Sequence, residues 1–90
     1  MYLKNIEIDE KENEIVLRRD LIRIYIRKLN QDQLIIDFEK EGSVTGVITT
    51  EMDNICHKCT SFDMFKEFVK VHPDEIWRML HSVFVSTLTL

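Results

Sequence analysis

The fold is decided by residues 21–50, which read LIRIYIRKLNQDQLIIDFEKEGSVTGVITT. Apolar and polar residues alternate within residues 22–27 and again within residues 34–39. A period of two residues indicates strands that bury one face and expose the other. We therefore predict two strands whose even-numbered side chains, such as Ile24 and Ile36, point into the core.

Two short connections constrain how these strands pair. The even-numbered residues of both strands can share a face only if the connection holds an odd number of residues, as residues 30–32 do. The next connection, residues 40–42, places glycine third, as in a type I turn followed by a left-handed residue. It predicts a third strand in which Gly46 lies opposite Ile36. Glycine at that position leaves room above the sheet for the close approach of a helix.

An earlier hairpin is predicted before this stretch. Residues 3–9 and 14–17 alternate in the same way and indicate two strands joined by the acidic loop 10–13. The inward residues of the second strand, such as Ile15, are odd-numbered, whereas those of the following strand are even-numbered. We therefore expect a β-bulge or a tight turn within residues 18–21.

After residue 50 the pattern changes to that of helices. Thr60 or Ser61 is expected to cap a first helix with one stripe of phenylalanine and valine. Pro73 suits the first position of a second helix, whose apolar face includes Val83. The uncharged residues 83–90 could fray that helix, continue it or form a short strand. The predicted fold class is α+β, with an antiparallel meander of four to five strands within residues 3–50 and two C-terminal α-helices within residues 60–86 packed on one face.

Length and composition agree with a single domain covering residues 1–90. The chain has 44% hydrophobic and 31% charged residues, with only two glycines and one proline, which argues against linkers and disorder. No apolar run is long enough to cross a bilayer, and the N-terminus does not resemble a signal peptide. We expect a cytoplasmic protein, in the host cytoplasm if a phage encodes it.

Acidic side chains gather near the start of the chain. The net charge of −4 disfavours nucleic acid as a direct ligand, because neutralised phosphates supply much of that affinity. Residues 7–14 contain five acids and one base, whereas residues 18–28 contain five of the twelve bases. These groups either pair internally or form a recognition surface. The candidate anionic face comprises Glu7, Asp9, Glu10, Glu12 and Glu14.

One motif has chemical content, the sequence Cys-His-Lys-Cys at residues 56–59. Two cysteines at this spacing can bind one zinc ion. A complete site would add two histidines from the helices, although their spacing does not match a zinc finger. The alternative metal set is Cys56, Cys59, His72 and His81. The cysteines could instead be a redox pair, because Cys59 lies just before a helix start, or two ordinary reduced thiols. Apart from zinc, we expect no cofactor.

A basic set with an aromatic ring in its middle is predicted on the outward face of one strand. Arg23, Tyr25 and Arg27 form this set, which resembles the way a sheet stacks single-stranded RNA. In the two expected registers, paired residue numbers sum to 62 or to 64, and both bring acids of the next strand opposite the arginines. We interpret the face as ion-paired and solvated, and an RNA-binding β-sheet stays as an alternative function.

The sequence does not indicate an enzyme. It has no glycine-rich phosphate loop, and no serine has the flanking glycines of a nucleophile elbow. In size, architecture and charge the chain is similar to small acidic inhibitors made by phages and mobile elements, and to immunity proteins that neutralise toxins. That resemblance implies a regulatory or inhibitory module that binds a protein with a basic site, not a membrane. An edge strand and the uncharged C-terminus also allow a homodimer.

Overall fold

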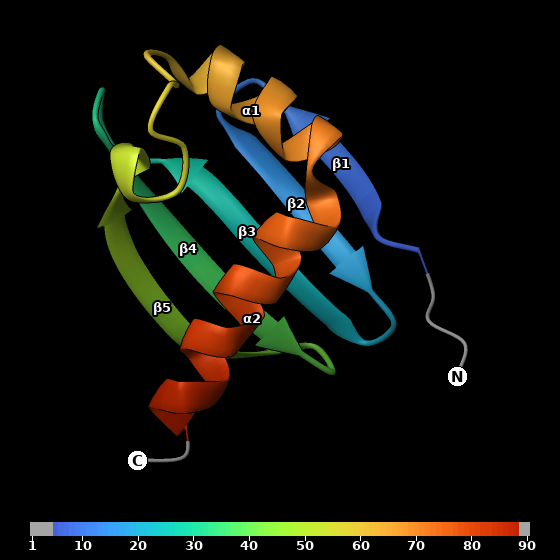
Figure 1. Cartoon of the computed structure of the whole chain (residues 1–90). Helices are drawn as coiled ribbons and strands as arrows, with labels where there is room; N and C mark the ends of the chain where they lie inside the picture. Colours follow the sequence, from blue (N-terminus) through green and yellow to red (C-terminus); the bar gives the residue numbers. More distant parts are fainter. Residues whose placement is uncertain (1–4, 89–90) are drawn as a thin grey trace.

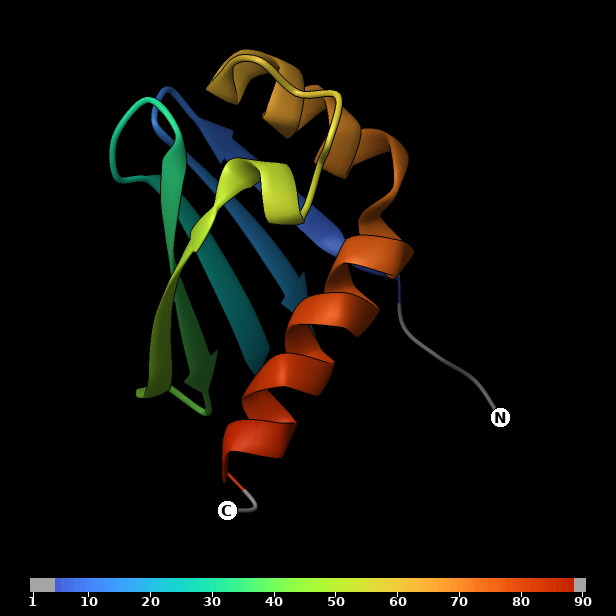
Figure 2. The same ribbon diagram turned by 60° about the vertical axis from the view of Figure 1, so that its left-hand side comes forward.

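A five-stranded antiparallel sheet in the order β1-β2-β3-β4-β5 is followed by two helices in the computed structural model, which describes residues 5–88. The elements are β1 (Glu7–Lys11), β2 (Glu14–Arg19), β3 (Ile22–Lys28), β4 (Gln33–Lys40), β5 (Ser43–Glu51), the short 3₁₀ helix η1 (Met52–Asn54), α1 (Phe62–Val71) and α2 (Pro73–Leu88). Both helices lie on one face of the sheet (Figures 1 and 2). The predicted α+β meander with two C-terminal helices is confirmed. The first two residues of the predicted first strand lie outside the described residues.

The strand pairings select one of the two expected β3–β4 registers and correct the predicted β4–β5 register. β3 and β4 pair with residue numbers summing to 62, so that Ile26 lies opposite Ile36. Between β4 and β5 the prediction is wrong by two residues, because Gly46 lies opposite Phe38 and not opposite Ile36. The β4–β5 turn has two residues and not three: Glu41 and Gly42, with positive φ angles of 53° and 85°. A bulge follows Val44 in β5, where Thr45 has no residue opposite it in β4.

The change of parity between β2 and β3 comes from a tight turn. Arg19 pairs with Ile22, so only Asp20 and Leu21 connect the two strands. Asp20 has a φ of 57°, a left-handed conformation that aspartate tolerates in turns. A two-residue turn pairs odd-numbered residues with even-numbered ones, which places Leu17 and Ile24 on the same face. The sequence predicts either a β-bulge or a tight turn within residues 18–21, and the structure has the tight turn.

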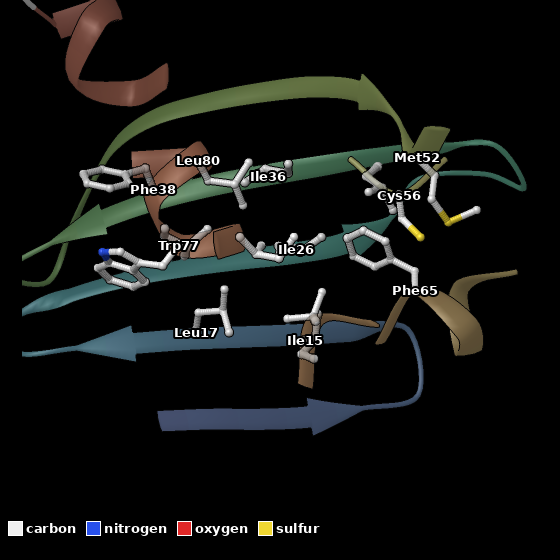
Figure 3. Close-up of a cluster of buried hydrophobic side chains, with 14 of the residues drawn as sticks. Ile15, Leu17, Ile26, Ile36, Phe38, Met52, Cys56, Phe65, Trp77 and Leu80 are labelled. Atoms are coloured by element: carbon white, nitrogen blue, oxygen red, sulfur yellow. The ribbon is translucent and has the colours of Figure 1, made fainter. Parts of the chain in front are cut away.

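The core lies between the inward face of the sheet and the helices (Figure 3). Ile15, Leu17, Ile24, Ile26, Leu34, Ile36 and Phe38 are buried on the sheet side, and Phe65, Val69, Ile76, Trp77, Leu80 and Phe84 are buried on the helix side. The Phe84 ring stacks on Phe38 at 4.8 Å between centroids. It also lies over Gly46, where a Cβ atom would come within 2.7 Å of it. The expected close approach of a helix at Gly46 is confirmed.

Local sequence explains where the helices begin. Ser61 is the N-cap of α1, and its hydroxyl accepts a hydrogen bond from the Met64 amide at 3.2 Å. Pro73 opens α2, which continues through the uncharged end of the chain as far as Leu88; residues 89 and 90 lie outside the described part. Val83, which the sequence placed on the buried face, is exposed. Within residues 5–88, neither helix is long and apolar enough to cross a bilayer.

Candidate functional site

The sheet has one face covered by helices and one open face. The strand registers arrange the side chains of the open face in rows that cross the sheet. From β1 to β4, the first row holds Glu7, Arg18, Arg23 and Glu39, the second holds Asp9, Val16, Tyr25 and Asp37, and the third holds Lys11, Glu14, Arg27 and Ile35. Two sets that the sequence predicted separately, acids of β1 and β2 and the basic set of β3, therefore lie side by side.

A hollow of about 430 Å³ lies on this open face over β1, β2 and β3, and we call it the β1–β3 hollow. Its acids are Glu7, Asp9 and Glu14, its bases are Lys11, Arg18 and Arg23, and Val16 and Tyr25 lie between them. Val16 is only 8% exposed, although it belongs to the open face. The hollow thus combines an apolar centre with an equal number of acids and bases.

Most charges around the β1–β3 hollow are already paired. Arg18 Nε donates to Glu7 Oε1 at 2.8 Å, and Lys11 Nζ lies 3.8 Å from Glu14 Oε1. Arg23 Nη1 donates to Glu39 Oε1 at 3.3 Å. These side chains neutralise one another, so the arginines do not present a free basic surface.

Tyr25 links this ion-paired row to the centre of the hollow. Its hydroxyl donates to Glu39 Oε2 at 3.3 Å. Its interaction with Arg23, followed by the charge of Glu39, raises the pKa of the Arg23 guanidinium above its usual value. Arginine is charged in proteins, and the ion pair with Glu39 holds the charge of Arg23 against β4.

Asp9 is the exception among the charged groups of the hollow. It lies in the central row next to Val16, with Tyr25 one strand further, and its side chain is exposed. Within residues 5–88 its carboxylate has no hydrogen bond or ion pair, whereas Glu7 and Glu14 both have basic partners. The hollow therefore carries one uncompensated negative charge beside an apolar and aromatic floor.

The five predicted acids do not form one continuous face. Side chains alternate along β1, so Glu7 and Asp9 belong to the open face and Glu10 to the covered face. Lys70 Nζ donates to Glu10 Oε1 at 2.8 Å, and Lys66 Nζ lies 3.4 Å from Glu10 Oε2. The hydrogen bond from Lys70 is the main cause that lowers the pKa of Glu10. Glu12 is exposed in the β1–β2 turn.

Lys66 is a buried residue of α1, although the sequence predicts only a stripe of phenylalanine and valine as the buried side of this helix. It is only 6% exposed, and its Nζ donates to the carbonyl oxygens of Lys11 at 2.8 Å and Glu12 at 3.0 Å. The ammonium group therefore fixes the β1–β2 turn against α1. A helical periodicity cannot reveal this role, because the two acceptors are backbone atoms more than fifty residues earlier in the chain.

The alternative zinc ligands are not brought together. Cys56 and Cys59 are joined by a disulfide with an S–S distance of 2.08 Å. His72 Nδ1 lies 3.3 Å from Glu75 Oε1, and His81 stacks against Trp77. In the described part of the chain, no three His, Cys, Asp or Glu side chains converge as metal ligands. The paired state of the cysteines also differs from two ordinary reduced thiols.

The basic set of β3 faces outward, as the sequence predicts, and Arg23 lies opposite its predicted partner Glu39. Arg27 lies opposite Ile35 and reaches Asp37 diagonally. Arg27 Nη2 donates to Asp37 Oδ2 at 2.5 Å. Arg27 Nε and Asp37 Oδ1 are buried and have no hydrogen-bond partner in the structure. Because both ends of the set are ion-paired, Tyr25 has no free cation beside it that could hold an RNA phosphate.

A larger hollow, of about 750 Å³, lies beside α2, and no pattern in the sequence predicts it. Arg19 lines this hollow and contacts two residues of α2. Its Nη2 donates to Asp74 Oδ1 at 3.0 Å, and its guanidinium carbon lies 5.3 Å from the centre of the Trp77 ring. These groups come from β2 and α2, and only the packing of α2 on the sheet brings them together. Arg19 and Asp74 compensate each other's charge, but Arg78 also lines this hollow, so its lining holds one more arginine than acid.

The fold and the open sheet face define a small α+β protein with a mixed-charge surface. In comparisons with known proteins, the chain matches no family model, no curated protein and no solved structure.

Proposed function

We propose that this protein is a small regulatory or inhibitory module that binds another protein by accepting one of its basic side chains in the β1–β3 hollow. The observation that carries the proposal is Asp9, an unpaired carboxylate at the edge of a hollow with an otherwise balanced charge. A lysine or arginine of the partner would lie between Asp9 and the Tyr25 ring, where an ion pair and a cation–π contact can act together.

The charge balance argues for a protein partner and against nucleic acid. A polyanion is held by several free lysines or arginines, but Arg18 and Arg23 are bound to glutamates. A protein surface offers mixed charges and apolar groups, which match the lining of the β1–β3 hollow. An acidic inhibitor of this kind would cover a basic site on a larger protein, consistent with the net charge of −4.

We place this function in the cytoplasm, or in the host cytoplasm if a phage encodes the protein. Cytoplasmic thiols are kept reduced, so the fold must tolerate reduction of the Cys56–Cys59 disulfide. The two cysteines are three positions apart, and closing so short a loop stabilises a protein by only about 2 kcal/mol. Because Cys56 is itself part of the buried core, we expect reduction to weaken the fold by about this amount without unfolding it.

The proposal is tested by titrating the folded protein with N-acetyl-arginine amide and following backbone amides by NMR. We expect saturable shifts at Asp9, Val16 and Tyr25, with a dissociation constant on the order of 1 mM for so small a ligand. Asp9→Asn should weaken binding several-fold, and high salt should weaken it in the wild type. Asp32→Asn is the matched control, because Asp32 is an exposed acid in the β3–β4 loop. Equal affinity in the wild type and Asp9→Asn would contradict the proposal.

The natural partner is then sought with the same three proteins as baits. A true partner is captured by the wild type and by Asp32→Asn, and it is lost with Asp9→Asn. A protein captured equally by all three baits does not use the β1–β3 hollow, and it would argue against this surface as the functional one.

A further inference from the structure

The two edges of the sheet are very different. β1, on one edge, has five residues, four of which are charged. β5, on the opposite edge, has nine residues and carries no charge or proline from Ser43 to Thr50. Charged and short edge strands resist pairing with other chains, whereas long uncharged ones accept it. In the described structure, only β4 pairs with β5, so the outer hydrogen-bonding edge of β5 is open.

Apolar side chains flank this edge on both faces of the sheet. On the open face Val44 and Val47 are 56% and 54% exposed. On the covered face Trp77 of α2 lies against Arg19 of β2 and Phe84 lies over Gly46 of β5, so α2 runs across the sheet from β2 toward β5 (Figures 1 and 2). At 3.6 residues per turn, Met79 and Val83 belong to the side of α2 turned away from Trp77. Both residues are exposed. A strand added to β5 would therefore bury apolar groups above and below the new backbone hydrogen bonds.

We propose that the added strand is β5 of a second copy of this chain, paired antiparallel across a two-fold axis. An antiparallel strand pair is self-complementary, and the absence of charge from Ser43 to Thr50 means that no like charges meet at the axis. The other arrangement, β5 against β1 of the next copy, would build an open filament. The charged residues of β1, including Lys11 and Glu7, oppose it.

The bulge in β5 limits which residues can pair. It follows Val44, so the regular part of the edge runs from Gly46 to Glu51. Pairing centred on Ile48 places Ile48 opposite its copy and Val47 opposite Thr49 of the second copy. Directly opposite residues share a face, so the helices of both copies lie on the same side of a continuous ten-stranded sheet. Met79 and Val83 of each copy then lie beside the junction.

The test is the molar mass of the full chain in solution, measured by sedimentation equilibrium over a range of concentrations. We expect a dimer that dissociates on dilution. Val47→Lys brings two like charges to diagonal positions near the axis, and it should weaken the dimer at least about tenfold. Val71→Lys is the matched control. Val71 is 70% exposed and belongs to α1, whose lysines contact β1 at the opposite edge of the sheet from β5. Val71→Lys should leave the dimer unchanged.

Amide hydrogen exchange identifies the surface that pairs. In the wild type, exchange at residues 46–51 should slow as concentration rises, and in Val47→Lys it should not. A chain that stays monomeric at every concentration would overturn the proposal, and so would a dimer that persists in folded Val47→Lys. Asp9 lies in β1, at the opposite edge of the sheet from β5, so Asp9→Asn should dimerise normally. Failure of the dimer and failure of the proposed binding site are therefore distinguishable.

Discussion

Gly46 is the residue at which the sheet and the last helix come closest. The Phe84 ring occupies the space that a side chain at position 46 would need. The sequence predicted room above this glycine, and the structure confirms it, but the residue opposite is Phe38. Phe38 and Phe84 stack, so Gly46 permits an aromatic pair that closes this end of the core.

Gly46→Ala should destabilise the protein by about 1–3 kcal/mol, because the new methyl group overlaps the Phe84 ring. Adding Phe84→Leu should recover part of that loss, so the double variant is more stable than the sum of the single effects. Urea unfolding of the four proteins measures this coupling. Gly42→Ala is the control. The φ of 85° at Gly42 makes alanine strained there, but a Cβ atom would meet no other part of the chain within 4 Å, so Phe84→Leu should not rescue this variant. If the destabilisations of Gly46→Ala and Phe84→Leu simply add in the double variant, the predicted overlap between the new methyl group and the Phe84 ring is contradicted.

At the scale of elements, α1 is tied to the first hairpin by charged groups. Glu10 of β1 accepts from Lys70, and Lys66 donates to the two carbonyls of the β1–β2 turn. Amphipathic patterning correctly predicted α1 and its cap, but a stripe of phenylalanine and valine does not indicate what either lysine contacts. Patterning describes one element at a time, whereas the partners of these lysines belong to an element far away in sequence. The same limit explains the β4–β5 register, because a three-residue turn and a two-residue turn followed by a bulge fit the same letters.

Stability should fall at acidic pH through Glu10. The hydrogen bond from Lys70 lowers the pKa of Glu10 below its ordinary value of 4.5. A lowered pKa in the folded state stabilises the protein above pH 4.5, and this contribution is lost as the pH falls through the folded-state pKa. Urea unfolding at about pH 7 and about pH 3 should show a larger loss in the wild type than in Glu10→Gln. Glu12→Gln, at an exposed position two residues away, should behave like the wild type.

At the scale of the whole molecule, one sheet face makes the core and the other stays open. The buried residues of β3 and β4 are even-numbered, namely Ile24, Ile26, Leu34, Ile36 and Phe38. On the open face the odd-numbered Arg23 and Arg27 form ion pairs with Glu39 and Asp37. This division was predicted correctly from periodicity. It assigns stability to the covered face and the proposed interactions to the open face and to the edge at β5.

Ile24→Asp should abolish cooperative unfolding, because a carboxylate at a fully buried position costs more than the whole stability of a small domain can offset. Arg23→Ala, at the adjacent position, should change the unfolding free energy by less than about 1 kcal/mol, since its ion pair is on the surface. Circular dichroism during urea titration measures both. A folded Ile24→Asp together with an unfolded Arg23→Ala would mean that the sheet faces the other way.

The sequence by itself determined the strand periods, the face that each strand buries and the starts of the helices, whereas it left two β3–β4 registers open. These properties depend on neighbouring residues, because side-chain direction and capping are set by the local backbone. Only the tertiary structure decided the β4–β5 register, the burial of Lys66, the separation of Glu10 from Asp9, and the grouping of Asp9 with Tyr25. Those features depend on which distant segments pack together, and packing is a property of the whole chain.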